Sequence, residues 1–136
     1  MTGREHLERI RDLQREIARR KARMETLRRY ATCITSRIRE ISVRSSHDPS
    51  RMQMFLAEAA DEEAEIRRLE QEVVRVRDDL LMILSQLPEE NLIRVVELHY
   101  LSGYTWPEIA ILMDCSERKV YYLHRRALKL LSDDSG

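Results

Sequence analysis

The side chains best suited to contact a polyanion are concentrated near the end of the chain. From Glu117 to Lys129 the sequence holds five basic residues and one acidic residue, although residues 89–136 as a whole carry 6 basic and 8 acidic groups. Arg and Lys neutralise phosphates, and side chains in the first turns of a helix can reach base edges in the major groove of DNA. The segment therefore predicts nucleic-acid recognition.

The same segment divides between two sides of a helix. At about 100° per residue, the apolar residues fall together and the basic and tyrosine residues fall opposite them. The expected core residues are Val120, Leu123, Ala127 and Leu131. The expected base-reading residues are Ser116, Glu117, Arg118, Lys119, Tyr121 and Tyr122, and the expected phosphate-contacting residues are Arg125, Arg126 and Lys129. A solvated helix surface is the alternative interpretation.

Three helices are expected to position this face. The first runs from about residue 88 to 102 and ends at Gly103, a typical C-terminal cap. Thr105 and Glu108 form a capping box for a short second helix, which tolerates Pro107 in its first turn. After a turn at Asp114, the third helix is expected to run from about residue 117 to 131. This layout is that of a helix-turn-helix.

Three further expectations concern residues next to the reading helix. Ser116 is the expected N-cap of that helix. Trp106 and Tyr104 are expected to pack over the supporting helix, and Cys115 is expected to be a small buried apolar residue.

A seven-residue repeat fills the first 87 residues. Apolar side chains occupy nine of ten a and d positions between residues 10 and 41, and ten of eleven between residues 52 and 87. A capping box of Thr2 and Glu5 is expected to start the first helix. Polar residues at 44–49 are expected to connect it to the second helix, which begins either with Asp48 as an N-cap before Pro49 or with a competing cap of Ser50 and Gln53. The pattern predicts an antiparallel coiled-coil hairpin that self-associates, since a two-helix seam buries only one stripe of each helix.

The heptads also predict a register for this hairpin. Every a position faces a d position if paired residue numbers sum to 93. The polar exceptions, Arg20 and Glu62, then face apolar or small partners, so Arg20 is expected to reach sideways to Glu70 or Glu72.

Composition and charge exclude several classes of protein. The chain has 136 residues with 24 basic and 24 acidic groups, but residues 1–50 carry a net charge of +6 and residues 51–88 a net charge of −4. Two Cys without metal-ligand spacing and four scattered His predict no metal site, no cofactor and no disulfide. Phosphate-binding loops, nucleophile motifs, long apolar segments and a signal-peptide core are not recognisable, so we expect no enzyme, no small-molecule substrate and no membrane contact.

The last third of the chain resembles region four of the sigma-70 family. The resemblance rests on the Leu-Pro-Glu-Glu start at 87–90, the segment from Val95 to Ala110, Cys115-Ser116 and Val120, and the His-Arg-Arg-Ala-Leu end at 124–128. It implies recognition of promoter DNA through the last helix. Two features depart from the family pattern: Asp114 stands where Gly is usual, and the preceding residues form a hairpin instead of region two.

Nearly the whole chain is similar to small proteins of phages and prophages of Gram-positive bacteria. Thr2, Glu5, Leu7, Ile10 and Leu13 match their N-terminal pattern. This similarity implies late-gene transcription control in the cytoplasm of a bacterial host.

The resulting prediction is an all-α protein with an oligomerising coiled-coil hairpin at 1–87 and a three-helix helix-turn-helix domain at 88–136. The expected partners are double-stranded DNA, a second copy of the chain and RNA polymerase. The alternatives are a DNA-packaging adaptor resembling a terminase small subunit and a helical interaction protein that does not bind DNA.

Overall fold

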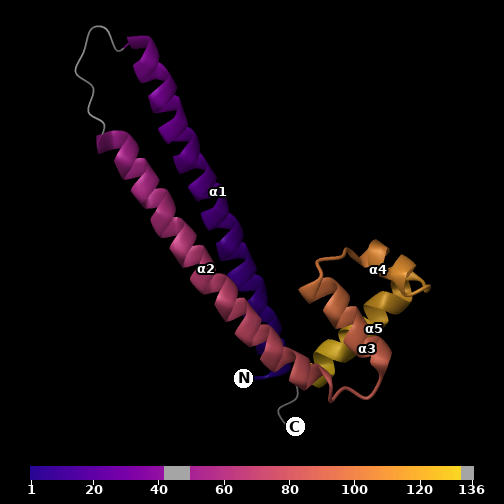
Figure 1. Cartoon of the computed structure of the whole chain (residues 1–136). Helices are drawn as coiled ribbons and strands as arrows, with labels where there is room; N and C mark the ends of the chain where they lie inside the picture. Colours follow the sequence, from indigo (N-terminus) through magenta and orange to yellow (C-terminus); the bar gives the residue numbers. More distant parts are fainter. Residues whose placement is uncertain (42–49, 133–136) are drawn as a thin grey trace. The chain divides into compact units, whose positions relative to one another are not determined.

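The computed structural model describes the backbone of residues 1–41 and 50–132 and the side chains of residues 1–33 and 50–132. These residues are all helical apart from short turns, which confirms the predicted fold class: long α1 packs against α2, and a helical C-terminal part follows (Figure 1). The elements are α1 (Gly3–Ile41), α2 (Ser50–Leu84), α3 (Glu90–Val96), the π-helix η1 (Glu97–Leu101), α4 (Trp106–Leu112) and α5 (Glu117–Leu131). Within the described part of the chain, no helix is long and apolar enough to span a membrane.

The ends of α1 and α2 follow their local sequence. The amide of Glu5 donates to Thr2 Oγ1 at 3.1 Å and the amide of Thr2 donates to Glu5 Oε2 at 3.4 Å, so the predicted capping box is confirmed. The expected connection at residues 44–49 lies outside the described residues. Helix α2 ends at Leu84, ahead of Pro88, because the amides of Gln86 and Leu87 turn back onto carbonyls within α2's last turn.

The chain divides into two compact units. One comprises residues 13–72, and the other combines residues 1–12 with residues 73–136. These units change at residues 12/13 and 72/73, whereas the sequence predicted a boundary between domains after residue 87. The boundary after residue 87 stays a prediction about functional domains.

In the unit of residues 13–72, α1 and α2 lie side by side in opposite directions (Figure 1). The contacts across the seam do not follow the predicted sum of 93. The rings of Tyr30 and Phe55 lie 5.8 Å apart and Arg23 Nε lies 3.5 Å from Glu62 Oε1, and both pairs of residue numbers sum to 85. The numbers of Lys21 and Glu70, which lie 3.9 Å apart, sum to 91. A slip of one heptad leaves every a position facing a d position, so the apolar pattern cannot distinguish the two registers.

The polar residues of the seam explain which register is adopted. Arg20 Nη1 lies 3.1 Å from Glu62 Oε2 and Arg20 Nε lies 3.2 Å from Glu16 Oε1, whereas Glu70 pairs with Lys21 at 3.9 Å. The carboxylates of Glu62 and Glu16 raise the pKa of Arg20 above its usual value. The predicted register would hold Arg20 and Glu62 too far apart along the helices to meet. In the observed register the two polar exceptions neutralise each other.

The other unit has its own hydrophobic core, to which both chain segments contribute. Leu7 and Ile10 of α1 and Leu80 and Leu84 of α2 are at most 2% exposed. They pack with the buried residues of the last three helices, which are Leu92, Val95, Val96, Ile109, Ala110, Val120, Leu123, Ala127 and Leu131. The ends of the two long helices therefore complete the core of the C-terminal helices.

The first turn of α1 packs closely on the last turn of α5. A Cβ atom placed on Gly3 would lie 2.7 Å from Leu131 Cδ2 and 3.1 Å from Ile83 Cγ2. Only Gly allows this approach without moving the neighbouring side chains. The packing leaves α5 anchored at its C-terminal end.

Candidate nucleic-acid interface

The supporting helix of the C-terminal part changes its pitch halfway along. The expected helix of residues 88–102 is an α-helix over Glu90–Val96 that continues as the π-helix η1. The amide of Ser102 donates to the carbonyl of Glu97 at 3.0 Å, and Gly103 then takes the left-handed conformation with φ +77°. The predicted glycine cap is thus confirmed. A π-turn inside a helix rotates the side chains that follow it, here towards α4 and α5.

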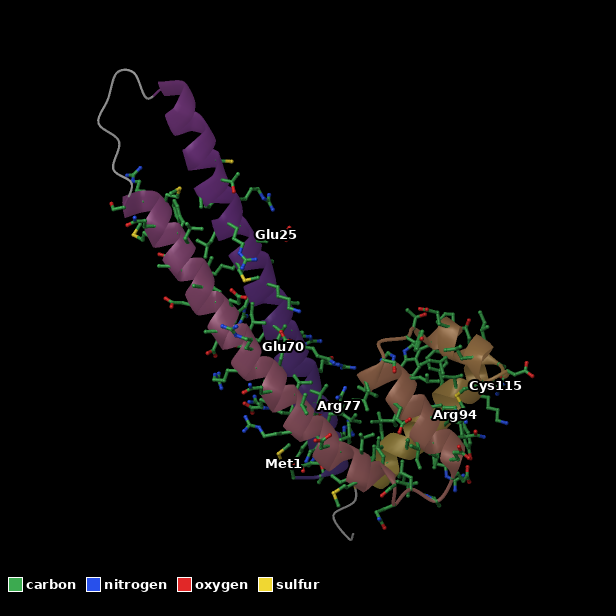
Figure 2. The ribbon with its side chains drawn as sticks, in the orientation of Figure 1. Met1, Glu25, Glu70, Arg77, Arg94 and Cys115 are labelled. Atoms are coloured by element: carbon green, nitrogen blue, oxygen red, sulfur yellow. The ribbon has the colours of Figure 1, made fainter. Side chains whose placement is uncertain are left out.

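Helix α4 and the turn after it also follow the predicted local chemistry. Thr105 Oγ1 accepts from the amide of Glu108, and the Glu108 carboxylate accepts from the Thr105 amide at 3.2 Å, completing the capping box. The Thr105 hydroxyl donates to Glu108 Oε1 at 2.7 Å, and this bond together with the one from the Thr105 amide lowers the pKa of Glu108. Asp114 adopts the left-handed conformation with φ 53°, so it takes the role that Gly has in the sigma-70 pattern. Cys115, labelled in Figure 2, is half-buried rather than fully buried.

The amphipathic character predicted for α5 is confirmed. Val120, Leu123, Ala127 and Leu131 are at most 3% exposed. The opposite side of the helix is open to solvent, and its residues are spaced i, i+4, i+7 and i+11, which keeps them on one stripe. These stripe residues are Arg118, Tyr122, Arg125 and Lys129.

Two open depressions border this stripe. Arg118, Tyr121, His124 and Arg125 line the first. Arg125 and Lys129 take part in the second together with Tyr122, Arg126 and Leu130. Tyr121 and Tyr122 are 43% and 53% exposed, so aromatic faces and guanidinium groups lie next to each other on the surface.

The remaining predicted site residues are Ser116, Glu117, Lys119 and Arg126, and they differ in their contacts. Ser116 Oγ accepts from the amide of Lys119 at 3.1 Å, so its hydroxyl caps α5 as predicted. Glu117 and Lys119 are exposed in the first turn. Arg126 forms an ion pair with Glu89 at 2.9 Å, which the sequence analysis did not anticipate. That ion pair links α5 to the residue before α3. The assignment of all nine predicted residues to DNA contacts stays a prediction.

A cluster of ring side chains joins η1, α4 and α5 beside the stripe. His99 stacks on Trp106 with ring centroids 3.8 Å apart, and Trp106 also contacts His124 and Tyr121 at 4.5 and 5.6 Å. The carbonyl of Tyr104 lies 2.9 Å from His99 Nδ1. Trp106 therefore packs over the supporting helix as expected, while Tyr104 is exposed.

The buried side of this cluster is held by a hydrogen bond. Tyr100 Oη lies 2.7 Å from His124 Nε2. Burial, with smaller contributions from His99, Arg11 and Arg4, lowers the pKa of His124 to about 4, so its ring is neutral at pH 7. Burial also raises the pKa of Tyr100.

His99, Tyr100, His124 and Glu89 had no role predicted from the sequence. Position 124 did carry a signal, because it lies four residues after Val120 and three before Ala127, at the edge of the apolar side. The π-turn that brings Tyr100 to it left no comparable signal. Among the described residues, no group of three or more His, Cys, Asp or Glu side chains is placed to hold a metal ion.

These features together define a helix-turn-helix of the DNA-binding class: a supporting helix, a capped short helix, a left-handed turn and a capped reading helix with an exposed basic stripe. Residues 77–131 match the family model described as sigma-70, region 4, in agreement with the resemblance found in the sequence. The matched segment begins within α2. The comparisons with curated proteins and with solved structures gave no match.

Proposed function

We propose that the protein is a transcription regulator that binds double-stranded DNA by placing α5 in the major groove. The observation that carries the proposal is the exposed stripe of Arg118, Tyr122, Arg125 and Lys129 opposite the buried face of α5. In a helix-turn-helix, the start of the second helix meets base edges and its later cations meet phosphates. The match of residues 77–131 to sigma-70 region 4 supports the same use.

Within this proposal the nine predicted residues divide by position. Arg118, Tyr121 and Tyr122 are exposed in the first two turns and have the reach for base edges, with Glu117 and Lys119 beside them. Arg125 and Lys129 contact phosphates. Ser116 acts through its cap, and Arg126 acts mainly by holding α5 against Glu89.

The narrower parts of the proposal rest on the sequence. The N-terminal pattern supports a regulator from a phage or prophage acting in the bacterial cytoplasm. The heptads of residues 1–87 support a coiled-coil hairpin that joins two copies of the chain, and the resemblance to sigma-70 region four supports contact with RNA polymerase. In this arrangement residues 88–136 bind DNA and the hairpin mediates protein contacts.

Selection of duplexes from a random library, followed by binding of the selected duplex over a range of salt concentrations, tests the function. The wild-type chain is expected to enrich one motif, and the logarithm of its binding constant should fall linearly with the logarithm of the salt concentration. A variant that loses one phosphate contact should have a slope that is smaller in magnitude by about 0.9. Arg125→Ala should lower that slope. The proposal is wrong if the wild-type chain binds no duplex at low salt.

The DNA-packaging adaptor remains the second candidate, because it would use the same reading helix with an oligomerising stalk. Analytical ultracentrifugation with and without the selected duplex separates the two functions. A regulator is expected to form a small symmetric oligomer on one site. A ring of many copies that binds without enriching a motif would favour the packaging adaptor. A chain that self-associates and never binds DNA would be the helical interaction protein.

A further inference from the structure

The ring cluster beside α5 extends onto a helix that the sequence assigned to the hairpin alone. Arg11 of α1 places its guanidinium carbon 5.4 Å from the centroid of the Tyr100 ring. The Tyr100 ring in turn lies 5.7 Å from that of His124 and is hydrogen-bonded to it. His124 shares a surface depression with Arg118 and Arg125. A path of short contacts thus links Arg11 to the stripe on α5.

Arg4 lies on the same side of α1. It precedes Arg11 by seven residues, which is close to two helical turns. Both side chains carry exposed charge, and both are near enough to the cluster to act on Tyr100 and His124 electrostatically. Arg4 is partly neutralised by Glu8, whose carboxylate lies 3.8 Å away and is itself exposed.

The core packing fixes this side of α1 against the reading helix. Leu7 lies between Arg4 and Arg11 in sequence and is buried among the residues that hold α5, and Gly3 packs against Leu131. Residues 1–12 belong to the same compact unit as α5. The two arginines are therefore carried by the same rigid core as the reading helix.

We propose that Arg4 and Arg11 of α1 form a second phosphate-binding element, which contacts the backbone of the duplex that α5 reads. The inference rests on the proposed DNA binding and adds a site outside the segment that matches sigma-70 region 4. Its chemistry is that of guanidinium groups beside a neutral histidine and a tyrosine. Such groups favour phosphate oxygens and carry no sequence preference.

Arg4 and Arg11 of α1 and Arg118 and Arg125 of α5 together form a basic strip, whose electrostatics agree with this assignment. His124 is neutral at pH 7, so the positive charge along the strip comes from Arg4, Arg11, Arg118 and Arg125. Stacking over Tyr100 orients the Arg11 guanidinium, and an oriented cation loses less side-chain entropy when it meets a phosphate. Arg11 is thus expected to contribute more than Arg4.

The test measures the binding of a fluorescent mixed-sequence duplex to the full chain at several salt concentrations. Arg11→Ala is expected to lower the salt slope by about 0.9, and Arg4→Ala combined with Arg11→Ala by up to twice that amount. Arg11→Lys keeps the charge and should keep the slope. Arg94→Ala is the matched control, because Arg94, labelled in Figure 2, is an exposed arginine on α3 that pairs with Glu90.

The outcomes separate the inference from the proposed function. If Arg125→Ala lowers the slope and Arg11→Ala does not, the function holds and the second element is refuted. If Arg11→Ala lowers both the affinity and the thermal stability but leaves the salt slope unchanged, Arg11 is a packing residue and the inference is again overturned. An equal slope change from Arg94→Ala would show a diffuse charge effect and refute a localised site. If the wild-type chain shows no binding, the proposed function itself fails.

Discussion

Replacing Leu7 with Ala should destabilise the DNA-binding unit, although Leu7 lies near the start of the chain. Its side chain is 2% exposed and is packed in the core formed by the last turns of α2 and the helices α3, α4 and α5. Leu→Ala changes at sites of this kind remove buried apolar atoms and leave a cavity, which costs about 2–5 kcal/mol. We expect the upper half of that range, because the neighbouring core side chains belong to four different helices and cannot all move inwards.

The assay can be confined to this unit because the chain has a single Trp, at position 106. Trp106 is stacked on His99, so its fluorescence follows the unfolding of the helix-turn-helix. Urea unfolding recorded at Trp106 should show a lower midpoint for Leu7→Ala than for the wild-type chain. Leu56→Ala, at a position on α2 that is 47% exposed, is the control and should change stability by no more than about 0.5 kcal/mol. The reasoning is refuted if the two variants unfold at the same urea concentration.

Three further predictions address the seam, the buried histidine and specificity. In a chain lacking Cys33 and Cys115, cysteines placed at 30 and 55 should react with a short bifunctional crosslinker faster than cysteines at 27 and 66; the reverse order would restore the register that the apolar pattern predicts. The folded-state pKa of His124, about 4, lies below its unfolded value of 6.5, so its contribution to stability is complete above pH 6.5 and is lost progressively as the pH falls to about 4. Urea unfolding of His124→Asn should lack this part of the pH dependence, and an unchanged profile would mean that another group titrates. Arg118→Ala should flatten the selected motif at one or two base pairs, a loss of roughly 1–3 kcal/mol of discrimination, while leaving binding to mixed-sequence DNA nearly intact; a uniform loss on all sequences would assign Arg118 to phosphate.

The sequence was most informative where structure is set by neighbouring residues. The capping residues Thr2, Thr105 and Ser116 and the left-handed positions Asp114 and Gly103 were all identified correctly, because each depends on hydrogen bonds or backbone angles within a few residues. The buried face of α5 was also predicted, since helical periodicity alone determines it.

Contacts between distant segments were harder to predict. The hairpin register failed because a repeating pattern fits itself equally well after a shift of seven residues, and the pairing of Arg20 with Glu62 was not weighed as a deciding interaction. The ion pair between Glu89 and Arg126 was missed because the two residues lie far apart in the sequence and Arg126 already had an interpretation as a phosphate ligand. The Tyr100–His124 hydrogen bond depends on a π-turn, which residue preferences along the helix do not indicate.

The core that joins Leu7 and Ile10 to the C-terminal helices also bears on how the chain folds during synthesis. These two residues are synthesised well before their core partners Ile109, Val120 and Leu131. Contacts of such large sequence separation carry a loop-closure cost that slows folding. Early pairing of α1 with α2 shortens the remaining loop and so speeds the closing step. The unit is therefore expected to acquire its native packing only after the segment that contains Leu131 has been synthesised and has met the paired ends of α1 and α2.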